Sequence, residues 1–486
     1  MKKSIIPLFA GLLLAWALLA GCARAAAPVT PPPADPAEAG DTACAISFVD
    51  DDGVQINLEQ PARRIISFYS AHTENLYALG AGDLVIGGHT TCIYPPEAAA
   101  TATFDYNGDP EYVIAAQPDL VLIRPFIRRK APDYVADLEK AGITVVSLYP
   151  ESYEAFPDYI RKLGQLTGFS EAAEAKLAAF FEEIEAISRL TATATEQRTV
   201  FFEATETNIR TVSAGSLPDL AIAFAGGLNL AAGAEPMTAG STIAEFGVEK
   251  VLENAERIDV YISQRGAMNA GGNLISISQR PGYQTIKAVR EGAVFTLNEK
   301  LISSPTFRYA LGVREVARFL YPALLDDLSP WENDQPASKR DFANILVRAR
   351  HLPVYVPSSS KYYQTAQRGH TYGLFEDVPW TDRDFDDIET AVYAGYVEWE
   401  RGAAGREYFR PEAPVTREQL AQAVFVMGDF QSGEGQSVIA DLEQCAKPRI
   451  IQSLVDQGVF ALNGGKFEPG RPVTNQEILD ALAFLP

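Results

Sequence analysis

The chain has 486 residues, of which 47% are hydrophobic and 21% charged, and its formal net charge is −22 at pH 7. This length exceeds what one ordinary core can organise and indicates two or three domains, while the composition is typical of a folded chain and excludes an intrinsically disordered one. The acidic balance argues against nucleic acid or anionic lipid as the main partner, because both select basic surfaces.

Residues 1–22 are expected to be a lipoprotein signal peptide. Two lysines precede the apolar run 5–20, and the segment ends in the letters LAGC, whose cysteine is Cys22. The run is too short and wrongly flanked for a structural membrane span. Its ending resembles the bacterial lipobox, which implies cleavage before Cys22 and attachment of lipid to it. An ordinary signal peptide with a chance cysteine is the alternative.

The segment that follows, residues 23–44, is rich in proline and alanine and predicts a tether without a core of its own. A lipid-held protein on such a tether works at the outer face of a membrane, in the periplasm or at the cell surface. Three cysteines remain, Cys44, Cys92 and Cys445, and their spacing is not that of metal ligands. Because their number is odd, they cannot all pair with one another; a disulfide between Cys44 and Cys92 is possible.

Residues 45–166 and 196–323 predict two α/β lobes, because short β-branched runs alternate with helical patterns in both. Each lobe should contain a mainly parallel, Rossmann-like sheet. Residues 167–195 predict one continuous connecting helix of about 20 residues, or about 30 Å. Ser170 is expected to be its N-cap, and apolar residues recur behind it at helical spacing.

Four motifs follow one another along the two lobes: "RRIISFYSAHTENLYALGAGDLVIGG", "DPEYVIAAQPDLVLIRP", "LEKAGITVVSL" and "GVEKVLENAERIDVYIS". In this order they resemble the helical-backbone solute-binding proteins of ABC importers, the group of the vitamin B12-binding and ferric-siderophore-binding proteins. The resemblance covers about residues 45–322. It implies a non-enzymatic protein with a permease and an ATPase as partners. The chain itself has no P-loop or G-x-S-x-G motif.

Two stretches about 140 residues apart share one pattern, in which a glutamate opens a short helix and an aspartate precedes an apolar strand. The pairs are Glu111 with Asp119 and Glu249 with Asp259. In the family that the chain resembles, each lobe offers an exposed glutamate to an arginine pocket on the permease, which would assign docking to Glu111 and Glu249. The alternative is that both are solvated acids favoured by a helix N-terminus.

The resemblance also implies a ligand held between the lobes by loops at the strand ends. The positions that match the family's pattern lie after predicted strands of both lobes. The candidate ligand-binding residues are Tyr69, Ser70, His72, Thr91, Cys92, Tyr106, Arg124, Arg128, Arg265, Ser304 and Arg308.

Arginines with tyrosines suit an anionic metal chelate whose apolar rim packs on aromatic rings. A ferric siderophore is therefore slightly preferred, and a corrinoid comes next. Haem would require an axial Tyr, His or Met, for which His72 or Tyr106 are the candidates. We expect neither a cofactor nor a metal site of the protein's own, since the chelator supplies the metal's ligands.

Residues 324–486 contain a repeated frame, F-x-P-x-x-P-V-T-x-x-[QE], at Phe409 and Phe467. Each copy predicts a capping box after a proline turn, and a degenerate third copy begins at Ser338. The repeats resemble S-layer homology domains, which bind cell-wall polymer; the best match is the letters VTRE, whose last three residues (Thr416, Arg417 and Glu418) are the candidate wall-binding residues.

The other two copies, "SKRD" and "VTNQ", depart from the S-layer signature, so a purely structural helical tail is the alternative for residues 324–486. For the whole protein, the competing hypothesis is a cell-envelope interaction protein whose lobes no longer transport. A cleft lined by arginines and tyrosines, with both glutamates exposed, favours transport over that hypothesis.

Overall fold

The computed structural model describes residues 46–485, with gaps at 239, 270–273, 358–370, 374, 429 and 431–434. The expected signal peptide, the lipidation site Cys22, the tether and Cys44 lie outside the described residues. In the part of the chain that is described, no helix is both long and apolar enough to cross a membrane.

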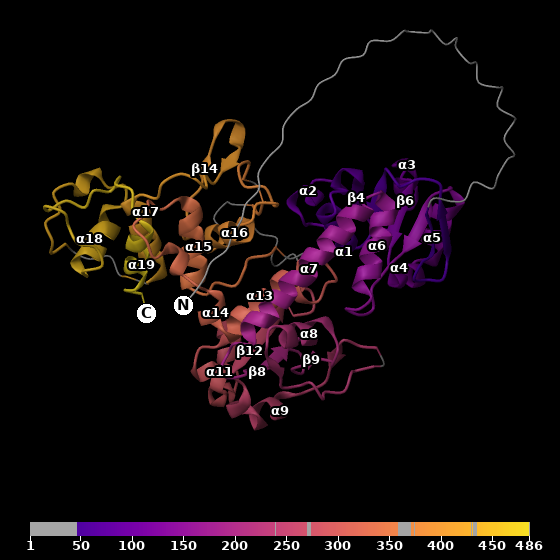
Figure 1. Cartoon of the computed structure of the whole chain (residues 1–486), viewed down its shortest axis with the longest axis horizontal. Helices are drawn as coiled ribbons and strands as arrows, with labels where there is room; N and C mark the ends of the chain where they lie inside the picture. Colours follow the sequence, from indigo (N-terminus) through magenta and orange to yellow (C-terminus); the bar gives the residue numbers. More distant parts are fainter. Residues whose placement is uncertain are drawn as a thin grey trace, which may run out of the picture. The chain divides into compact units, whose positions relative to one another are not determined.

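The N-lobe is built on a five-stranded parallel sheet in the order β5-β4-β3-β6-β7. Apolar residues of β3 and β6 alternate between two cores, because successive side chains of a strand point to opposite faces. Ile65 and Leu120 pack in the core that contains helix α6, whereas Ile66 and Val121 pack in the core that contains α5. Helices thus cover both faces of the sheet (Figure 1).

The elements of the N-lobe are β1 (Ile46–Val49), β2 (Gln55–Leu58), β3 (Ile65–Ser67), α1 (Ser70–Ala78), β4 (Val85–His89), α2 (Pro96–Ala99), β5 (Ala102–Phe104), α3 (Glu111–Ala115), β6 (Leu120–Ile123), α4 (Pro125–Lys130), α5 (Pro132–Lys140), β7 (Thr144–Ser147) and α6 (Phe156–Thr167). The pair β1–β2 is an antiparallel hairpin before the sheet.

The C-lobe repeats this plan with a four-stranded parallel sheet in the order β10-β8-β12-β13. Its elements are β8 (Thr199–Glu203), β9 (Thr211–Val212), α8 (Leu217–Phe224), β10 (Leu228–Asn229), β11 (Ile243–Ala244), α9 (Val248–Glu253), β12 (Val260–Arg265), α10 (Leu274–Ser278), α11 (Lys287–Arg290), β13 (Val294–Asn298), α12 (Glu299–Ile302), α13 (Tyr309–Leu320) and α14 (Pro322–Leu325).

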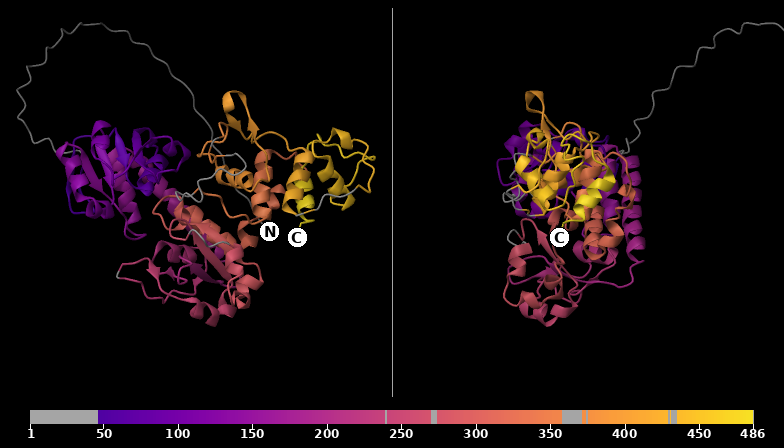
Figure 2. Two further views of the ribbon diagram at one scale, coloured as in Figure 1. Left: turned by 180° about the vertical axis from the view of Figure 1, so that it is seen from behind. Right: turned by 90° about the vertical axis from the view of Figure 1, so that its left-hand side faces the viewer.

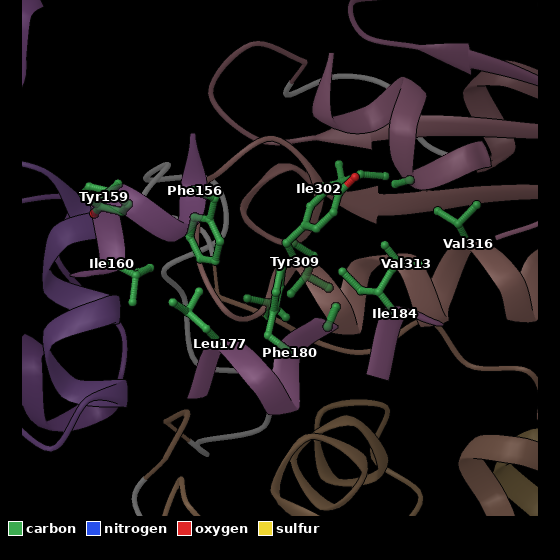
Figure 3. Packing of buried hydrophobic residues seen from close by; sticks show 14 of the residues in the cluster. Phe156, Tyr159, Ile160, Leu177, Phe180, Ile184, Ile302, Tyr309, Val313 and Val316 are labelled. Atoms are coloured by element: carbon green, nitrogen blue, oxygen red, sulfur yellow. The ribbon is translucent and has the colours of Figure 1, made fainter. Parts of the chain in front are cut away.

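Helix α7 (Ser170–Thr191) connects the lobes and packs on helices of both. The Phe180 ring lies 5.0 Å from the Phe156 ring of α6 and 6.4 Å from the Tyr309 ring of α13, between ring centroids. Figure 3 shows Leu177, Phe180 and Ile184 directed into this shared core. The prediction of two α/β lobes joined by one long helix is therefore confirmed.

One detail of the connecting helix differs from the prediction. Ser170 is the first helical residue, and Phe169 occupies the N-cap position without a side-chain cap. The tight packing before the helix explains this start: the Phe169 N–H donates to the Gly164 carbonyl, which fixes the chain one residue earlier.

Most regular elements of the C-terminal module, residues 324–485, are helices, and the module has its own hydrophobic core. Its orange-to-yellow helices are visible in both views of Figure 2. Its regular elements are α15 (Lys339–Ala349), α16 (Phe385–Tyr393), β14 (Glu400–Arg401), β15 (Glu407–Tyr408), α17 (Arg417–Met427), α18 (Pro448–Asp456) and α19 (Asn475–Leu482).

The three copies of the repeat close into a ring. Ala337 N–H donates to the Val473 carbonyl at 2.9 Å, Val473 N–H to Val415 at 3.0 Å, and Val415 N–H to Ala337 at 3.0 Å. Each of these residues precedes the N-cap of one helix, and all three predicted capping boxes form. The degenerate copy at Ser338 is thus structurally equivalent to the other two.

Candidate functional site

The repeated glutamate–aspartate pattern has one structural meaning in both lobes. Asp119 accepts the backbone N–H groups of Arg63 and Arg64 at 2.8 and 3.0 Å, and Asp259 accepts that of Thr199 at 2.8 Å. Each aspartate thereby joins the start of its own strand to the start of the neighbouring strand, β3 or β8. Asp119 and Asp259 thus hold the sheets together, whereas Glu111 and Glu249 take no part in these contacts.

Glu111 is the first residue of α3, and Glu249 lies in the first turn of α9. Both side chains are exposed to solvent. Neither forms an ion pair with any residue that the structure describes. Two exposed carboxylates at matching positions of two lobes are able to pair with guanidinium groups of another protein.

A cation–aromatic surface, which we define as Tyr69, Arg124, Phe126 and Tyr149, lies at the carboxyl ends of β3, β6 and β7. The Arg124 guanidinium carbon is 4.9 Å from the Tyr69 ring centroid and 5.0 Å from that of Phe126. The Tyr69 and Tyr149 rings are 6.0 Å apart. Burial is the main cause that raises the pKa of Tyr69, so its hydroxyl stays protonated.

The surface continues along the ends of β4 and β5. His89 stacks on Tyr106 with 5.3 Å between ring centroids, and the Lys130 Nζ lies 5.5 Å from the Tyr106 ring. Thr91 Oγ1 is 3.0 Å from His89 Nδ1. Burial lowers the pKa of His89, which favours the neutral ring at neutral pH. This edge of the N-lobe thus carries Arg124 and Lys130 beside aromatic faces.

Four other candidate residues face the interior: Ser70, His72, Cys92 and Ser304 are buried. His72 is held by the Tyr159 hydroxyl at 2.8 Å and the Ile123 carbonyl at 3.0 Å, and burial lowers its pKa to about 4. Cys92 is a free thiol whose pKa burial raises. The Ser70 hydroxyl accepts a hydrogen bond from Lys300 Nζ of the C-lobe at 3.2 Å.

Two candidate arginines already have carboxylate partners. Arg308 makes two 3.0 Å hydrogen bonds to Glu74, and its guanidinium carbon lies 3.5 Å from the Tyr94 ring centroid. Arg128 bonds Asp52 at 3.1 Å and Glu139 at 2.9 Å. The structure thus brings Tyr69, Arg124, Tyr106 and Thr91 together at the N-lobe edge and places these two arginines in intramolecular ion pairs.

A cavity of about 160 Å³ lies between the lobes. The loop after β7, including Tyr149 and Tyr153, forms its N-lobe side, and Ser216, Gln264 and Ser303 lie on its C-lobe side. Pockets for drug-sized ligands measure roughly 300–1,000 Å³, so a ligand of that size would extend beyond this cavity, which shares Tyr149 with the cation–aromatic surface.

Sequence reasoning missed several residues of this region: Phe126, Lys130, Tyr149, Gln264 and Ser303. Tyr149 and Lys130 directly follow predicted elements, so position alone could have indicated them; nothing in the pattern of residues 264 and 303 distinguishes them from core positions. Across the described ranges, no cluster of three or more His, Cys, Asp or Glu side chains is arranged to hold a metal ion.

The candidate wall-binding residues lie at the start of α17. Thr416 accepts the Gln419 N–H within the capping box, and Glu418 accepts the Lys447 N–H at 2.7 Å. Arg417 is buried and donates to the carbonyls of Phe467 at 3.0 Å and Ala461 at 2.6 Å. Burial lowers the pKa of Arg417. Its guanidinium group therefore joins the second and third repeats.

Comparison with known proteins matches residues 65–301 to the periplasmic binding protein family. An uncharacterised ABC transporter substrate-binding lipoprotein of Bacillus subtilis, YvrC, is 25% identical over 324 residues, which cover 65% of this chain and 96% of that protein. A cobalamin-binding protein of Halobacterium salinarum is 29% identical over 188 residues, or 37% of this chain, and the match spans half of that protein (50%).

Two solved structures are among those similar to this chain. A possible iron-binding, periplasmic solute-binding protein of Staphylococcus epidermidis is 22% identical with a TM-score of 0.47, covering 54% of this chain and 100% of that chain. The periplasmic haem-binding protein RhuT of Roseiflexus is 24% identical with a TM-score of 0.45, covering 54% of this chain and 99% of that chain.

Proposed function

We propose, from the match of residues 65–301 to the periplasmic binding protein family, that the protein captures a metal chelate between its two lobes and delivers it to the permease of an ABC importer. The protein is a solute-binding component and not an enzyme, in agreement with its similarity to a periplasmic binding protein family and to an ABC transporter substrate-binding lipoprotein. ATP hydrolysis belongs to a partner subunit.

The observation that carries this proposal is the cation–aromatic surface of Tyr69, Arg124, Phe126 and Tyr149. It lies at the carboxyl ends of parallel strands, where α/β proteins bind their ligands. Its guanidinium group lies over the rings of Tyr69 and Phe126 and has no carboxylate partner among the described residues. An anionic chelate with an apolar rim matches both properties of the surface.

A ferric siderophore is the preferred ligand, because Arg124 and Lys130 together favour an anionic chelate. A corrinoid is the second candidate, supported by the cobalamin-binding relative, which matches over 188 residues. Haem is a weaker candidate, since His72 is buried and both of its ring nitrogens already have partners, which leaves Tyr106 as the remaining candidate axial ligand.

We further propose that lipid attached to Cys22 holds the protein at the outer face of a membrane and that Glu111 and Glu249 dock onto arginine pockets of the permease. The relative YvrC is a lipoprotein of the same class, which supports the anchor. A single exposed ion pair contributes only about 0–1 kcal/mol, so the two glutamates would fix orientation and encounter more than affinity.

The test uses the chain from residue 23 onward, titrated with a ferric hydroxamate siderophore, a ferric catecholate siderophore, cobalamin and haem while thermal unfolding is followed. A ligand at 100 times its Kd adds about 2.7 kcal/mol of stability, so the true ligand raises the unfolding midpoint saturably. Absence of any shift with all four would contradict the metal-chelate assignment.

The docking assignment is tested separately with the double variant Glu111→Ala/Glu249→Ala. Uptake of the bound chelate by cells should fall at least tenfold, while its Kd stays within twofold of that of the unaltered protein. The double variant Glu59→Ala/Glu291→Ala removes one exposed glutamate from each lobe outside α3 and α9 and should leave uptake unchanged. Loss of ligand binding in folded Glu111→Ala/Glu249→Ala protein would show that these residues serve another purpose.

The second candidate function, an envelope-interaction protein whose module binds cell-wall polymer, is favoured by the closed ring of the three repeats, an arrangement of three equivalent helix starts. Co-sedimentation of the chain with purified cell walls, with and without the wall polymer removed, tests it. Polymer-dependent sedimentation would support this role, and equal sedimentation in both cases would exclude it.

A further inference from the structure

A second cavity, of about 320 Å³, lies at the junction of the C-lobe and the C-terminal module. Arg265, Thr296 and Asn298, at the ends of β12 and β13, form the C-lobe side. Tyr355 and Tyr393 are among the residues of the module side. Arg265, a sequence-predicted ligand residue, lines this cavity, whereas its neighbour Gln264 lines the cavity between the lobes.

The module wall of this junction cavity is fixed by hydrogen bonds from three separate elements. Asn298 Nδ2 of β13 donates to the Val356 carbonyl at 2.7 Å, Val354 N–H donates to Glu315 of α13 at 2.9 Å, and Tyr355 N–H donates to Thr390 of α16 at 2.9 Å. Segment 352–356 is thus anchored at Val354, Tyr355 and Val356. Preformed cavities of this size, about 300 Å³ and above, are typical of small-molecule sites.

The chemistry of the lining defines the ligand. The Tyr355 and Tyr393 rings are stacked face to face, with 3.6 Å between centroids and 10° between planes, so each covers one face of the other and the pair offers its outer faces and ring edges. Val354 and Val356, both buried, add apolar surface beside it. Arg265 contributes a guanidinium group and Thr296 a hydroxyl group to the same cavity.

We propose that the junction cavity binds a compact, planar aromatic carboxylate, whose ring lies against the Tyr355–Tyr393 pair and whose carboxylate reaches Arg265. A flat apolar body matches a ring surface, and a carboxylate matches the planar donor fork of an arginine. Tyr355 and Tyr393 lie outside the family match, which ends at residue 301, so this site depends on the appended module. The proposal is independent of the transported chelate and of the Arg124 surface.

The test is isothermal titration of the chain from residue 23 onward with 2-naphthoate and with its neutral analogue 2-naphthalenemethanol. We expect saturable one-to-one binding of 2-naphthoate and at least tenfold weaker binding of the alcohol. Arg265→Gln should weaken 2-naphthoate at least tenfold and abolish its preference over the alcohol. Ala394→Phe, which fills the cavity without removing an existing side chain, should abolish binding of both probes.

The unfolding midpoints of the ligand-free variants serve as the control for folding. Arg265→Gln removes a charged contact and Ala394→Phe fills the cavity, so a folding defect in one variant leaves the other informative. Arg124→Ala distinguishes the two sites. Undiminished 2-naphthoate binding in Arg124→Ala supports the junction site, whereas its loss there would place the probe between the lobes and overturn the proposal. No saturable binding up to 1 mM 2-naphthoate, which corresponds to a binding free energy weaker than about −4 kcal/mol, would overturn it as well.

Discussion

Arg124 of the N-lobe and Arg308 of the C-lobe are both predicted ligand-binding residues, yet their surroundings differ. Arg124 lies over two aromatic rings, half-buried and without a carboxylate partner in the described chain. Arg308 is paired with Glu74, which is 234 positions away in the sequence, and its guanidinium lies on the Tyr94 ring. The charge of Arg124 is available to a ligand, whereas the charge of Arg308 joins the two lobes.

The comparison shows that an arginine at a strand end indicates a ligand contact only when no acid of the same chain reaches it. Glu74 is 6% exposed, so it has little solvent to stabilise its charge other than through Arg308. We therefore expect removal of a member of such a pair to act on folding and removal of Arg124 to act on binding. Three measurements can separate these effects.

The largest effect is expected for Glu74→Gln, which leaves the Arg308 guanidinium buried without its counter-charge. Breaking a buried pair by removing one partner lowers the free energy of unfolding by about 3–5 kcal/mol. Urea unfolding measures this change. The matched control is Glu174→Gln, which removes an exposed partner of Arg161 and should change stability by less than about 1 kcal/mol. Equal effects of the two substitutions would show that the buried Glu74–Arg308 pair contributes no more to stability than an exposed pair.

An intermediate effect is expected at Asp387, a half-buried carboxyl on α16 without an ion-pair partner in the described part of the chain. Burial raises its pKa from 3.8 to about 6. The folded state therefore holds this proton more tightly than the unfolded state, and the stabilising contribution of Asp387, complete below about pH 4, is lost as the pH rises to about 6.

Asp387→Asn removes this titration. The stability of the variant relative to the unaltered protein should rise between pH 4 and pH 6, by at most about 3 kcal/mol, and stay constant above that range, since one pKa unit corresponds to about 1.4 kcal/mol. Denaturant unfolding at a series of pH values gives the difference curve. A difference that is flat across this range would show that Asp387 has an ordinary pKa.

The smallest effect in energy is expected for Arg124→Ala, which should weaken binding of an anionic ferric chelate about tenfold, or about 1.4 kcal/mol, and leave the unfolding midpoint within the experimental error. Arg129→Ala, on the exposed side of α4, is the matched control and should leave the Kd unchanged. Tenfold weakening by both would indicate a general charge effect and not a contact.

The sequence by itself determined the features that depend on residues close together in the chain. The βα alternation predicted both sheets, helical spacing predicted α7, and the three capping boxes formed as predicted, at Ser338, Thr416 and Thr474. The repeated Glu–Asp pattern also led to matching positions in both lobes. These signals are local, because propensity, periodicity and capping act within a few residues.

Only the tertiary structure decided which candidate side chains reach the surface. About half of the candidate ligand residues lie at the edge of a cavity or on the N-lobe surface, and the others are buried or paired inside the protein, as His72 is with Tyr159 and Arg308 with Glu74. The contacts between the lobes and the C-terminal module could not be predicted from the sequence either. Asn298 donates to Val356, and the Tyr94 ring lies 6.1 Å from that of Trp380. Such pairs join residues far apart in sequence, and no local pattern encodes which acid, carbonyl or ring will fold against a given side chain.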